Sequence, residues 1–283
     1  MAAKPKPGRP QLTNAARPAT FEVEAHNERG EMVPTSIAGE HPLTLYLDKR
    51  ELVTLMTLGH APEALAIGFL RNQRLVATIK DIASVQVDWE TDSVAVVTRK
   101  VHKDIGKKIA RRTVTTGCGQ GTVYGDLMEE IDRIKLRKNV TLEDVQLFVL
   151  IEKVRKHETI YKQAGAVHGC ALATRAGEIL MFVEDVGRHN AVDAIAGFMW
   201  LDGIDGSDKV FYTTGRLTSE MVIKCTQMRI PFLVSRSGLT NMGHQIAERV
   251  GLTMIGRASG RHYLAFTGKQ RLLRTAPQPT ALA

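Results

Sequence analysis

The chain has 283 residues, of which 43% are hydrophobic, 24% charged and 5% aromatic, and its mean hydropathy is −0.12. This composition is that of a globular protein and excludes a collagen-like, mucin-like or wholly disordered chain. No apolar run approaches the roughly 18 residues of a membrane span, and no apolar segment follows the basic N-terminus as in a secretory signal. Three cysteines are too few for a disulfide framework, so we expect a cytoplasmic protein.

The formal net charge is +8 and the isoelectric point is about 9.5. Residues 1–20 contain four basic side chains and residues 269–283 contain three, with no acid in either segment. A third basic stretch lies between Arg99 and Arg112, which is either a solvated face or an electropositive rim beside the residues that follow. Since the excess charge lies largely in the tails and aromatic side chains for base stacking are few, nucleic-acid binding is the weaker alternative.

Residues 1–18 hold four prolines and little that can be buried, which predicts a disordered basic tail. Alternating leucines predict a hairpin within residues 42–58, and Pro62 marks the start of a helix. A second hairpin is predicted over residues 85–97. Residues 19–138 therefore read as a smaller α+β domain.

The rest of the chain has a different pattern. Thr141 and Asp144 form a capping box for a helix that ends near His157, and a hairpin is predicted within residues 170–183. Helices and strands then alternate. The predicted helices are 191–199, 219–228 and 241–250, and the predicted strands are 209–212, 231–234, 253–255 and 262–266. This alternation predicts an α/β domain with parallel strands over residues 139–268, followed by a basic tail at 269–283.

Parallel sheets bind ligands at the carboxyl ends of their strands, which here are residues 184–190, 213–219, 235–240 and 256–261. The first of these holds two acids, an arginine, a histidine and an asparagine within seven residues. It is either a ligand-binding turn or a polar loop that caps the next helix. Arg216 follows Gly215 at the next strand end, which suits contact with an anion, and Arg257 to Arg261 repeat the pattern.

Cys118 lies between Gly117 and Gly119, close after the basic stretch. Nearby positive charge favours the reactive thiolate, so this is either a reactive thiol or a turn with an ordinary small residue. Cys170 and Cys225 lie in apolar strand and helix patterns and are expected in the core. A zinc site is not expected, because Gly121 stands where a CxxC partner of Cys118 would be.

Four segments of the chain are distinctive as a set: Glu184-Asp-Val-Gly-Arg-His-Asn-Ala191, Gly165-Ala-Val-His168, Thr214-Gly-Arg216 and Leu65-Ala-Ile-Gly-Phe-Leu70. Together they resemble the FdhD family of formate dehydrogenase accessory sulfurtransferases. The resemblance runs from about Pro42 to Gly268. It implies a C-terminal domain with a cytidine-deaminase-like α/β/α fold and a mixed sheet, without zinc.

The same resemblance implies a function. A cysteine desulfurase would donate sulfur to Cys118 as a persulfide. The chain would pass that sulfur to the bis-guanine-dinucleotide form of the molybdenum cofactor before the cofactor enters apo formate dehydrogenase. The implied catalytic residue is Cys118. The implied cofactor-binding residues are His168, Asp185, Gly187, Arg188, His189, Asn190, Gly215, Arg216, Arg257, Ala258, Ser259, Gly260, Arg261 and His262.

The chain departs from the family pattern at two places. A second cysteine usually follows the first in the family, whereas this chain has Gly121, so only a one-cysteine relay is available. Gln73 and Arg74 replace a usual Glu-Gly pair. The first departure motivates an alternative function, a molybdenum-cofactor chaperone that does not transfer sulfur. The family also implies a homodimer that binds neither nucleic acid nor membrane.

Overall fold

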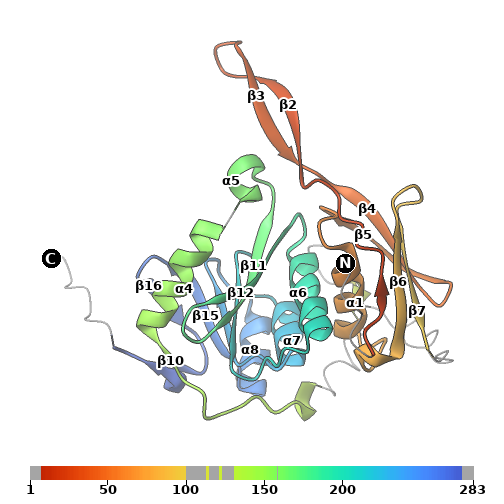
Figure 1. Ribbon diagram of the computed structural model, residues 1–283. Coiled ribbons are helices and arrows are strands. Elements are labelled where there is room, and N and C mark those ends of the chain that lie inside the picture. The colour runs from red at the N-terminus through yellow and green to blue at the C-terminus, as the bar shows by residue number, and fades with distance from the viewer. Residues whose placement is uncertain (1–7, 100–112, 115–120, 123–130, 158, 276–283) are drawn as a thin grey trace, which may run out of the picture. The chain divides into compact units, whose positions relative to one another are not determined.

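The computed structural model describes residues 8–99, 113–114, 121–122, 131–157 and 159–275 (Figure 1). The chain forms two compact units, each discontinuous in sequence. The first comprises Met1–Glu130, Glu158–Cys170 and Val183–Ile204, and the second comprises Ile131–His157, Ala171–Phe182 and Asp205–Ala283. This division differs from the expected boundary at residue 138, because the segment that includes helix α6 belongs to the first unit.

The first unit contains a five-stranded sheet with strand order β1-β6-β7-β4-β5. Its strands are β1 (Gln11–Leu12), β4 (His41–Leu47), β5 (Arg50–Thr57), β6 (Ile82–Asp88) and β7 (Ser93–Thr98). Strands β4 and β5 form the first predicted hairpin, and β6 and β7 form the second. The leucines that alternate along β4 are fully buried, so the period-two pattern correctly identified the core face.

Residues 8–18 are ordered, which corrects the prediction of a disordered tail over that part of residues 1–18. Gln11 pairs with Ser84, and the Ala15 amide donates to Glu63 Oε1 at 2.8 Å. The Arg17 guanidinium lies 4.7 Å from the centre of the Trp89 ring. Proline-rich composition predicted disorder, but pairing along β6 and these side-chain contacts fix the segment.

Two helices pack closely in the first unit, α1 (Pro62–Asn72) and α6 (Arg188–Asp202). A Cβ at Gly68 would lie 1.6 Å from the Asp193 carbonyl oxygen, and one at Gly197 would lie 1.9 Å from the Ala64 carbonyl oxygen. The absence of both side chains therefore permits backbone-to-backbone contact. The buried Asn72 amide also donates to Asp193 Oδ1 at 2.7 Å.

The first unit also contains a two-stranded antiparallel ribbon of β2 (Thr20–His26) and β3 (Met32–Ala38). It extends as a hairpin in Figure 1, and helix α5 (Ile160–Ala164) contacts it. The sequence interpretation did not identify this ribbon, because its apolar residues are separated by glutamates and by Pro34.

The second unit contains most of a six-stranded sheet, whose strand order is β12-β11-β13-β14-β15-β16. Its strands are β11 (His168–Thr174), β12 (Ile179–Asp185), β13 (Lys209–Thr213), β14 (Phe232–Ser235), β15 (Thr253–Ser259) and β16 (His262–Ala265). Strands β13, β14 and β15 are parallel, as predicted, and β16 is antiparallel to β15. The unit's helices are α4 (Asp144–His157), α7 (Ser219–Gln227) and α8 (Asn241–Val250).

The predicted mixed α/β fold is confirmed. A short parallel pair, β10 (Leu142–Glu143) and β17 (Leu272–Leu273), lies beside the N-terminus of α4. Another short pair, β8 (Thr113–Val114) and β9 (Gly121–Thr122), is antiparallel. Across the part of the chain that the structure describes, no helix has the length and apolar character needed to cross a membrane.

Candidate functional site

The polar turn after β12 is held by a buried carboxylate. Asp185 is 5% exposed, and its Oδ2 accepts hydrogen bonds from Thr57 Oγ1 at 2.5 Å and from the Leu58 amide at 3.1 Å. Its Oδ1 accepts from the Gly187 amide at 2.9 Å and from Asn190 Nδ2 at 2.8 Å. Asp185 therefore ties the turn to the end of β5, more than 120 residues away in sequence.

Burial raises the pKa of Asp185 above its ordinary value, and the four hydrogen bonds oppose that shift. Asn190 extends the link, since its Nδ2 also donates to the Met56 carbonyl oxygen at 2.6 Å. A Cβ at position 187 would lie 2.9 Å from Asn190 Nδ2, so Gly187 leaves the space that this amide occupies. The hydrogen bonds of Asp185 and Asn190, together with the space left by Gly187, therefore fix the shape of the turn.

Glu184 has a capping role that the sequence did not predict. Its carboxylate accepts from the Thr159 amide and hydroxyl and from the amides of Ile160 and Tyr161, at 3.0–3.1 Å. These amides begin α5, so a carboxylate from a distant turn caps the helix N-terminus. The predicted cap was for the helix that follows the turn, α6, whose N-cap is Gly187, so capping of α5 by Glu184 is a different role from the predicted one.

The remaining predicted residues of the first unit lie near the same turn. Arg188 and His189 begin α6 and are 5% and 2% exposed, and the amide of Ala191 donates to the Gly187 carbonyl oxygen. His168 begins β11 and is half-buried. The structure therefore places Asp185, Gly187, Arg188, His189 and Asn190 at one helix start, and their binding of a cofactor remains a prediction.

In the second unit, the predicted residues lie at the carboxyl ends of parallel strands. Ser235 Oγ at the end of β14 donates to the Gly215 carbonyl oxygen at 2.6 Å, which joins the turns after β13 and β14. Leu217 and Leu239 extend this link as an isolated parallel bridge. Arg216 directly precedes Leu217 and is exposed, so its guanidinium is accessible to an anion.

The segment at the end of β15 exposes several polar groups. Its Arg257 amide donates to the Ser237 carbonyl oxygen at 2.9 Å, and Arg257 has a left-handed backbone with φ of 52°. Ala258 is 1% exposed and belongs to the core. The other predicted residues of the segment are exposed: Arg257, Ser259, Gly260, Arg261 and His262.

Gly260 and Arg261 also line a surface groove of about 630 Å³ beside α4. Its apolar wall consists of Val145, Phe148 and Val149. The groove also has charged residues on its lining: Glu143, Glu152, Lys153 and Arg261.

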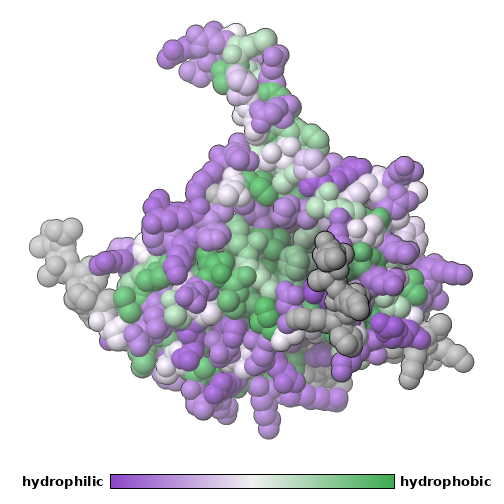
Figure 2. Space-filling view, viewed as in Figure 1, coloured by the Kyte–Doolittle hydropathy of each residue, from purple (hydrophilic) through white to green (hydrophobic). Residues whose placement is uncertain are grey.

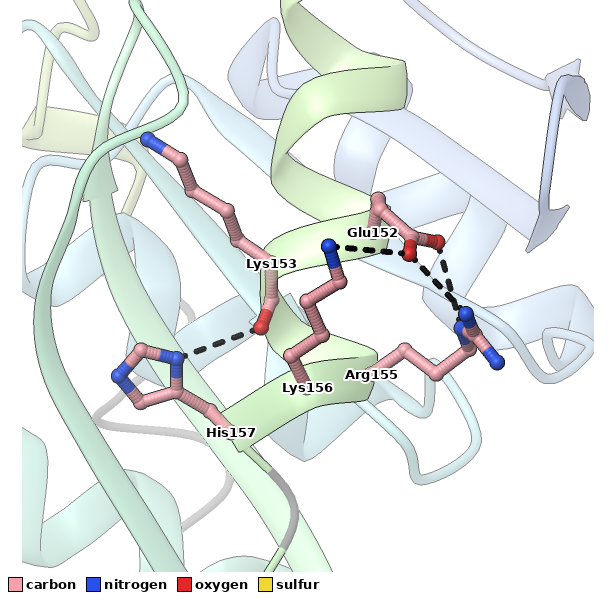
Figure 3. Close-up of polar contacts among 5 residues, drawn as sticks. All are labelled: Glu152, Lys153, Arg155, Lys156 and His157. Carbon is pink, nitrogen blue, oxygen red and sulfur yellow. Dashed lines mark hydrogen bonds and ion pairs between the residues drawn. The ribbon is translucent and has the colours of Figure 1, made fainter.

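The charge of Glu152 is compensated by its own helix. Its Oε1 lies 3.0 Å from Arg155 Nη2 and 3.6 Å from Lys156 Nζ, while Lys153 extends away from the carboxylate (Figure 3). The hydrogen bond from Arg155 lowers the pKa of Glu152. The negative charge of Glu152 is therefore paired with two cations of its own helix.

Cys118, the predicted catalytic residue, lies outside the described residues. The two short strands β8 and β9 precede and follow its segment, and their Val114–Gly121 pair brings the segment's ends together. Cys170 and Cys225 are fully buried, as predicted. Among the described residues, no three His, Cys, Asp or Glu side chains gather as metal ligands.

Known proteins resemble the chain over most of its length. A protein named sulfur carrier protein FdhD from Listeria monocytogenes is 31% identical over 242 residues, which are 85% of this chain and 92% of that protein. The protein of that name from Sulfurisphaera tokodaii is 31% identical over 87% of this chain and 95% of its own length.

A solved structure and a family model agree with these relatives. The crystal structure of a putative formate dehydrogenase accessory protein from Desulfotalea psychrophila has 25% sequence identity and a TM-score of 0.75. The alignment covers 90% of this chain and all of that one. The family model matches residues 38–273, and the chain belongs to the FdhD/NarQ family.

Proposed function

We propose that this protein is a sulfurtransferase that carries sulfur as a persulfide on Cys118 and delivers it to the molybdenum cofactor of a formate dehydrogenase. The observation that carries the proposal is the near-full-length similarity to proteins named sulfur carrier protein FdhD. The likeness to a formate dehydrogenase accessory protein indicates the client enzyme.

The first step is a thiol exchange. The thiolate of Cys118 attacks the terminal sulfur of a persulfide on a cysteine desulfurase, a Cys118 persulfide forms, and the donor cysteine leaves as its thiolate. Seven basic residues between Arg99 and Arg112 precede Cys118 in the sequence, and positive charge near a cysteine lowers its pKa. One cysteine is sufficient for this step, so the glycine at position 121 does not prevent it.

The cargo is the bis-guanine-dinucleotide form of the molybdenum cofactor, whose pyrophosphates make it polyanionic. Exposed arginines at strand ends suit such a ligand, because a guanidinium binds two phosphate oxygens at once. Arg216, Arg257 and Arg261 provide these groups in the second unit. We assign binding to them together with Gly215, Ser259, Gly260 and His262, and we keep the turn of Asp185 and His168 as further candidates.

Mass spectrometry tests the carrier step. After incubation with a cysteine desulfurase and cysteine, a mass increase of about 32 Da, one sulfur atom, is expected on the Cys118 peptide. Cys170 and Cys225 are internal controls, since both are fully buried. An unmodified Cys118 in a protein whose added sulfur lies elsewhere would refute the proposal.

Nucleotide binding tests the cargo site separately. Guanosine diphosphate is the probe, and we expect Arg216→Ala or Arg261→Ala to weaken its binding by roughly 10-fold to 100-fold, the value of one or two charge-assisted hydrogen bonds. Arg29→Ala is the control, because Arg29 is exposed at the end of the β2–β3 ribbon. Equal affinities for all variants would contradict the assignment.

A chaperone that binds the cofactor without transferring sulfur is the second candidate, and the single cysteine of the segment favours it. Formate dehydrogenase activity in cells separates the two. Sulfur transfer requires that Cys118→Ala abolish the activity, whereas a chaperone would retain it. For either function, we propose that the protein is a cytoplasmic homodimer and that it contacts apo formate dehydrogenase. We also propose that its C-terminal domain has a cytidine-deaminase-like fold.

A further inference from the structure

The segment of residues 8–18, which we call the N-terminal strap, is held on the first unit by Arg17. The Arg17 amide donates to the Gly59 carbonyl oxygen at 2.8 Å, and its Nη2 donates to the Trp89 carbonyl oxygen at 3.3 Å. Its guanidinium lies over the Trp89 ring, and Trp89 Nε1 donates to the Ala15 carbonyl oxygen at 2.6 Å. A Cβ at Gly59 would lie 3.0 Å from the Trp89 ring and 3.3 Å from Arg17 Cβ, so this glycine leaves room for both side chains.

A histidine also holds this arginine. His41 begins β4, and its Nδ1 lies 3.2 Å from Arg17 Nη1. A guanidinium donates hydrogen bonds and accepts none, so Nδ1 is the acceptor and carries no proton. The neutral ring then has its proton on Nε2, which is buried without a hydrogen-bond partner among the described residues. The closed strap therefore requires the neutral form of His41.

Two aromatic rings and two charged groups lie around His41. The ring centres of Phe21 and Trp89 are 5.9 and 6.0 Å from that of His41. Phe21 comes from the β2–β3 ribbon, along which Figure 2 shows hydrophobic residues among the hydrophilic ones. Within the described part of the chain, the charged groups that act on the ring are Arg17 of the strap and Asp92 in the turn between β6 and β7. Burial and Arg17 lower the pKa of His41, and Asp92 opposes them.

A proton on His41 makes its contact with Arg17 unfavourable. The proton would occupy Nδ1, so Arg17 Nη1 would lose its acceptor and a second cation would stand 3.2 Å from the guanidinium nitrogen. When the strap is open, His41 is free of Arg17 and its pKa returns toward the ordinary value of about 6.5. The open form therefore binds a proton more readily than the closed form. By linkage, the stability of the closed form is fully present above about pH 6.5 and is lost as the pH falls below it.

We propose that Arg17, His41 and Trp89 form a pH-sensitive clasp that closes the N-terminal strap at neutral pH and releases it in acid. The strap contains β1, which covers the edge of the five-stranded sheet beside β6. Its release therefore leaves β6 as an open edge strand, with backbone groups that another strand can pair with. The clasp involves neither Cys118 nor the arginines assigned to the cofactor, so its failure leaves the proposed function untouched.

Hydrogen exchange of the full chain, followed by mass spectrometry, measures the opening of the strap. The probes are the amides of Ala15 and Arg17, which donate to Glu63 and Gly59 in the closed form. Each rate is divided by the intrinsic exchange rate of an unprotected amide at the same pH, which gives the opening constant. We expect this constant to rise about 3- to 10-fold in the wild type between about pH 7.5 and about pH 5.5, because the lower value lies below the ordinary pKa of a histidine.

His41→Asn separates the clasp from other effects of acid. The asparagine oxygen can accept from Arg17 in place of Nδ1 but does not titrate, so we expect its opening constant to change less than about twofold over the same range. His26→Asn is the matched control, because His26 is exposed on β2, and it should keep the wild-type response.

Two outcomes of the exchange experiment would overturn the proposal: a wild-type opening constant that does not depend on pH, or equal responses of the wild type and His41→Asn. Titration of the wild type by nuclear magnetic resonance is a second test that does not require the variant to fold. A His41 pKa at or above the ordinary value of about 6.5 would also overturn the proposal.

Discussion

Replacement of Asp185 by Asn tests whether this carboxylate holds the turn after β12. The two oxygens of Asp185 accept four hydrogen bonds, whereas Asn offers one oxygen and one NH₂ group. The amide oxygen is best placed toward Gly187 and Asn190, where both partners are donors. Its NH₂ group then faces Thr57, whose hydroxyl can turn to accept, and the Leu58 amide, which loses its acceptor.

The magnitude follows from these contacts. One buried N–H without an acceptor costs about 1–3 kcal/mol, and the bonds that remain no longer involve a charged acceptor. The neutral amide is easier to bury than a carboxylate, which offsets part of this cost. We therefore expect a net loss of about 2–4 kcal/mol in the free energy of unfolding. The loss is local to the first unit, which contains Asp185 and both tryptophans, Trp89 and Trp200.

Urea unfolding followed by tryptophan fluorescence measures this loss. Asp202→Asn is the control, because Asp202 forms a solvent-exposed ion pair with Arg9 at 3.3 Å, and such pairs contribute less than about 1 kcal/mol. If Asp185→Asn destabilises no more than Asp202→Asn, the turn is not held by this carboxylate and the reasoning is wrong.

Three further predictions concern the same unit. Burial raises the pKa of Asp185 in the folded state. As pH rises, this carboxyl therefore loses its proton at a lower pH in the unfolded chain than in the folded one. The stability of the wild type relative to Asp185→Asn, measured by urea unfolding, is then highest below about pH 4, the pKa of an unfolded aspartate, and falls as pH rises through the folded pKa; a difference that grows with pH would show that the hydrogen bonds outweigh burial. Gly68→Ala should lower stability by at least about 3 kcal/mol in thermal unfolding, since its Cβ would lie 1.6 Å from a carbonyl oxygen, whereas Gly238→Ala, with nothing within 4 Å, should be near neutral. Glu184→Gln should accelerate hydrogen exchange at the first amides of α5 by roughly 10-fold, and the exposed Glu178→Gln should leave them unchanged.

The order and kind of most elements could be predicted from the sequence. Alternating apolar residues identified β4 with β5 and β6 with β7, and the Thr141–Asp144 pattern located the start of α4 to within a few residues. The parallel order of β13, β14 and β15 followed from the alternation of helices and strands. These features depend on neighbours in sequence, which is why local patterns predict them.

The features that could not be predicted depend on contacts that are distant in sequence. The order of residues 8–18 comes from β6, Glu63 and Trp89, and nothing in the segment itself indicates them. The same holds for Asp185, whose partners Thr57 and Leu58 are ordinary strand-end residues. The polar turn was correctly singled out, but part of its chemistry is structural.

Transfer of isotopically labelled sulfur tests the central claim most directly. The reaction contains a cysteine desulfurase, labelled cysteine, this protein and apo formate dehydrogenase with its cofactor. The account predicts that label enters the cofactor with the wild type and not with Cys118→Ser, while both proteins retain guanosine diphosphate binding. Equal labelling by the two proteins, or an active formate dehydrogenase that carries no label, would contradict it.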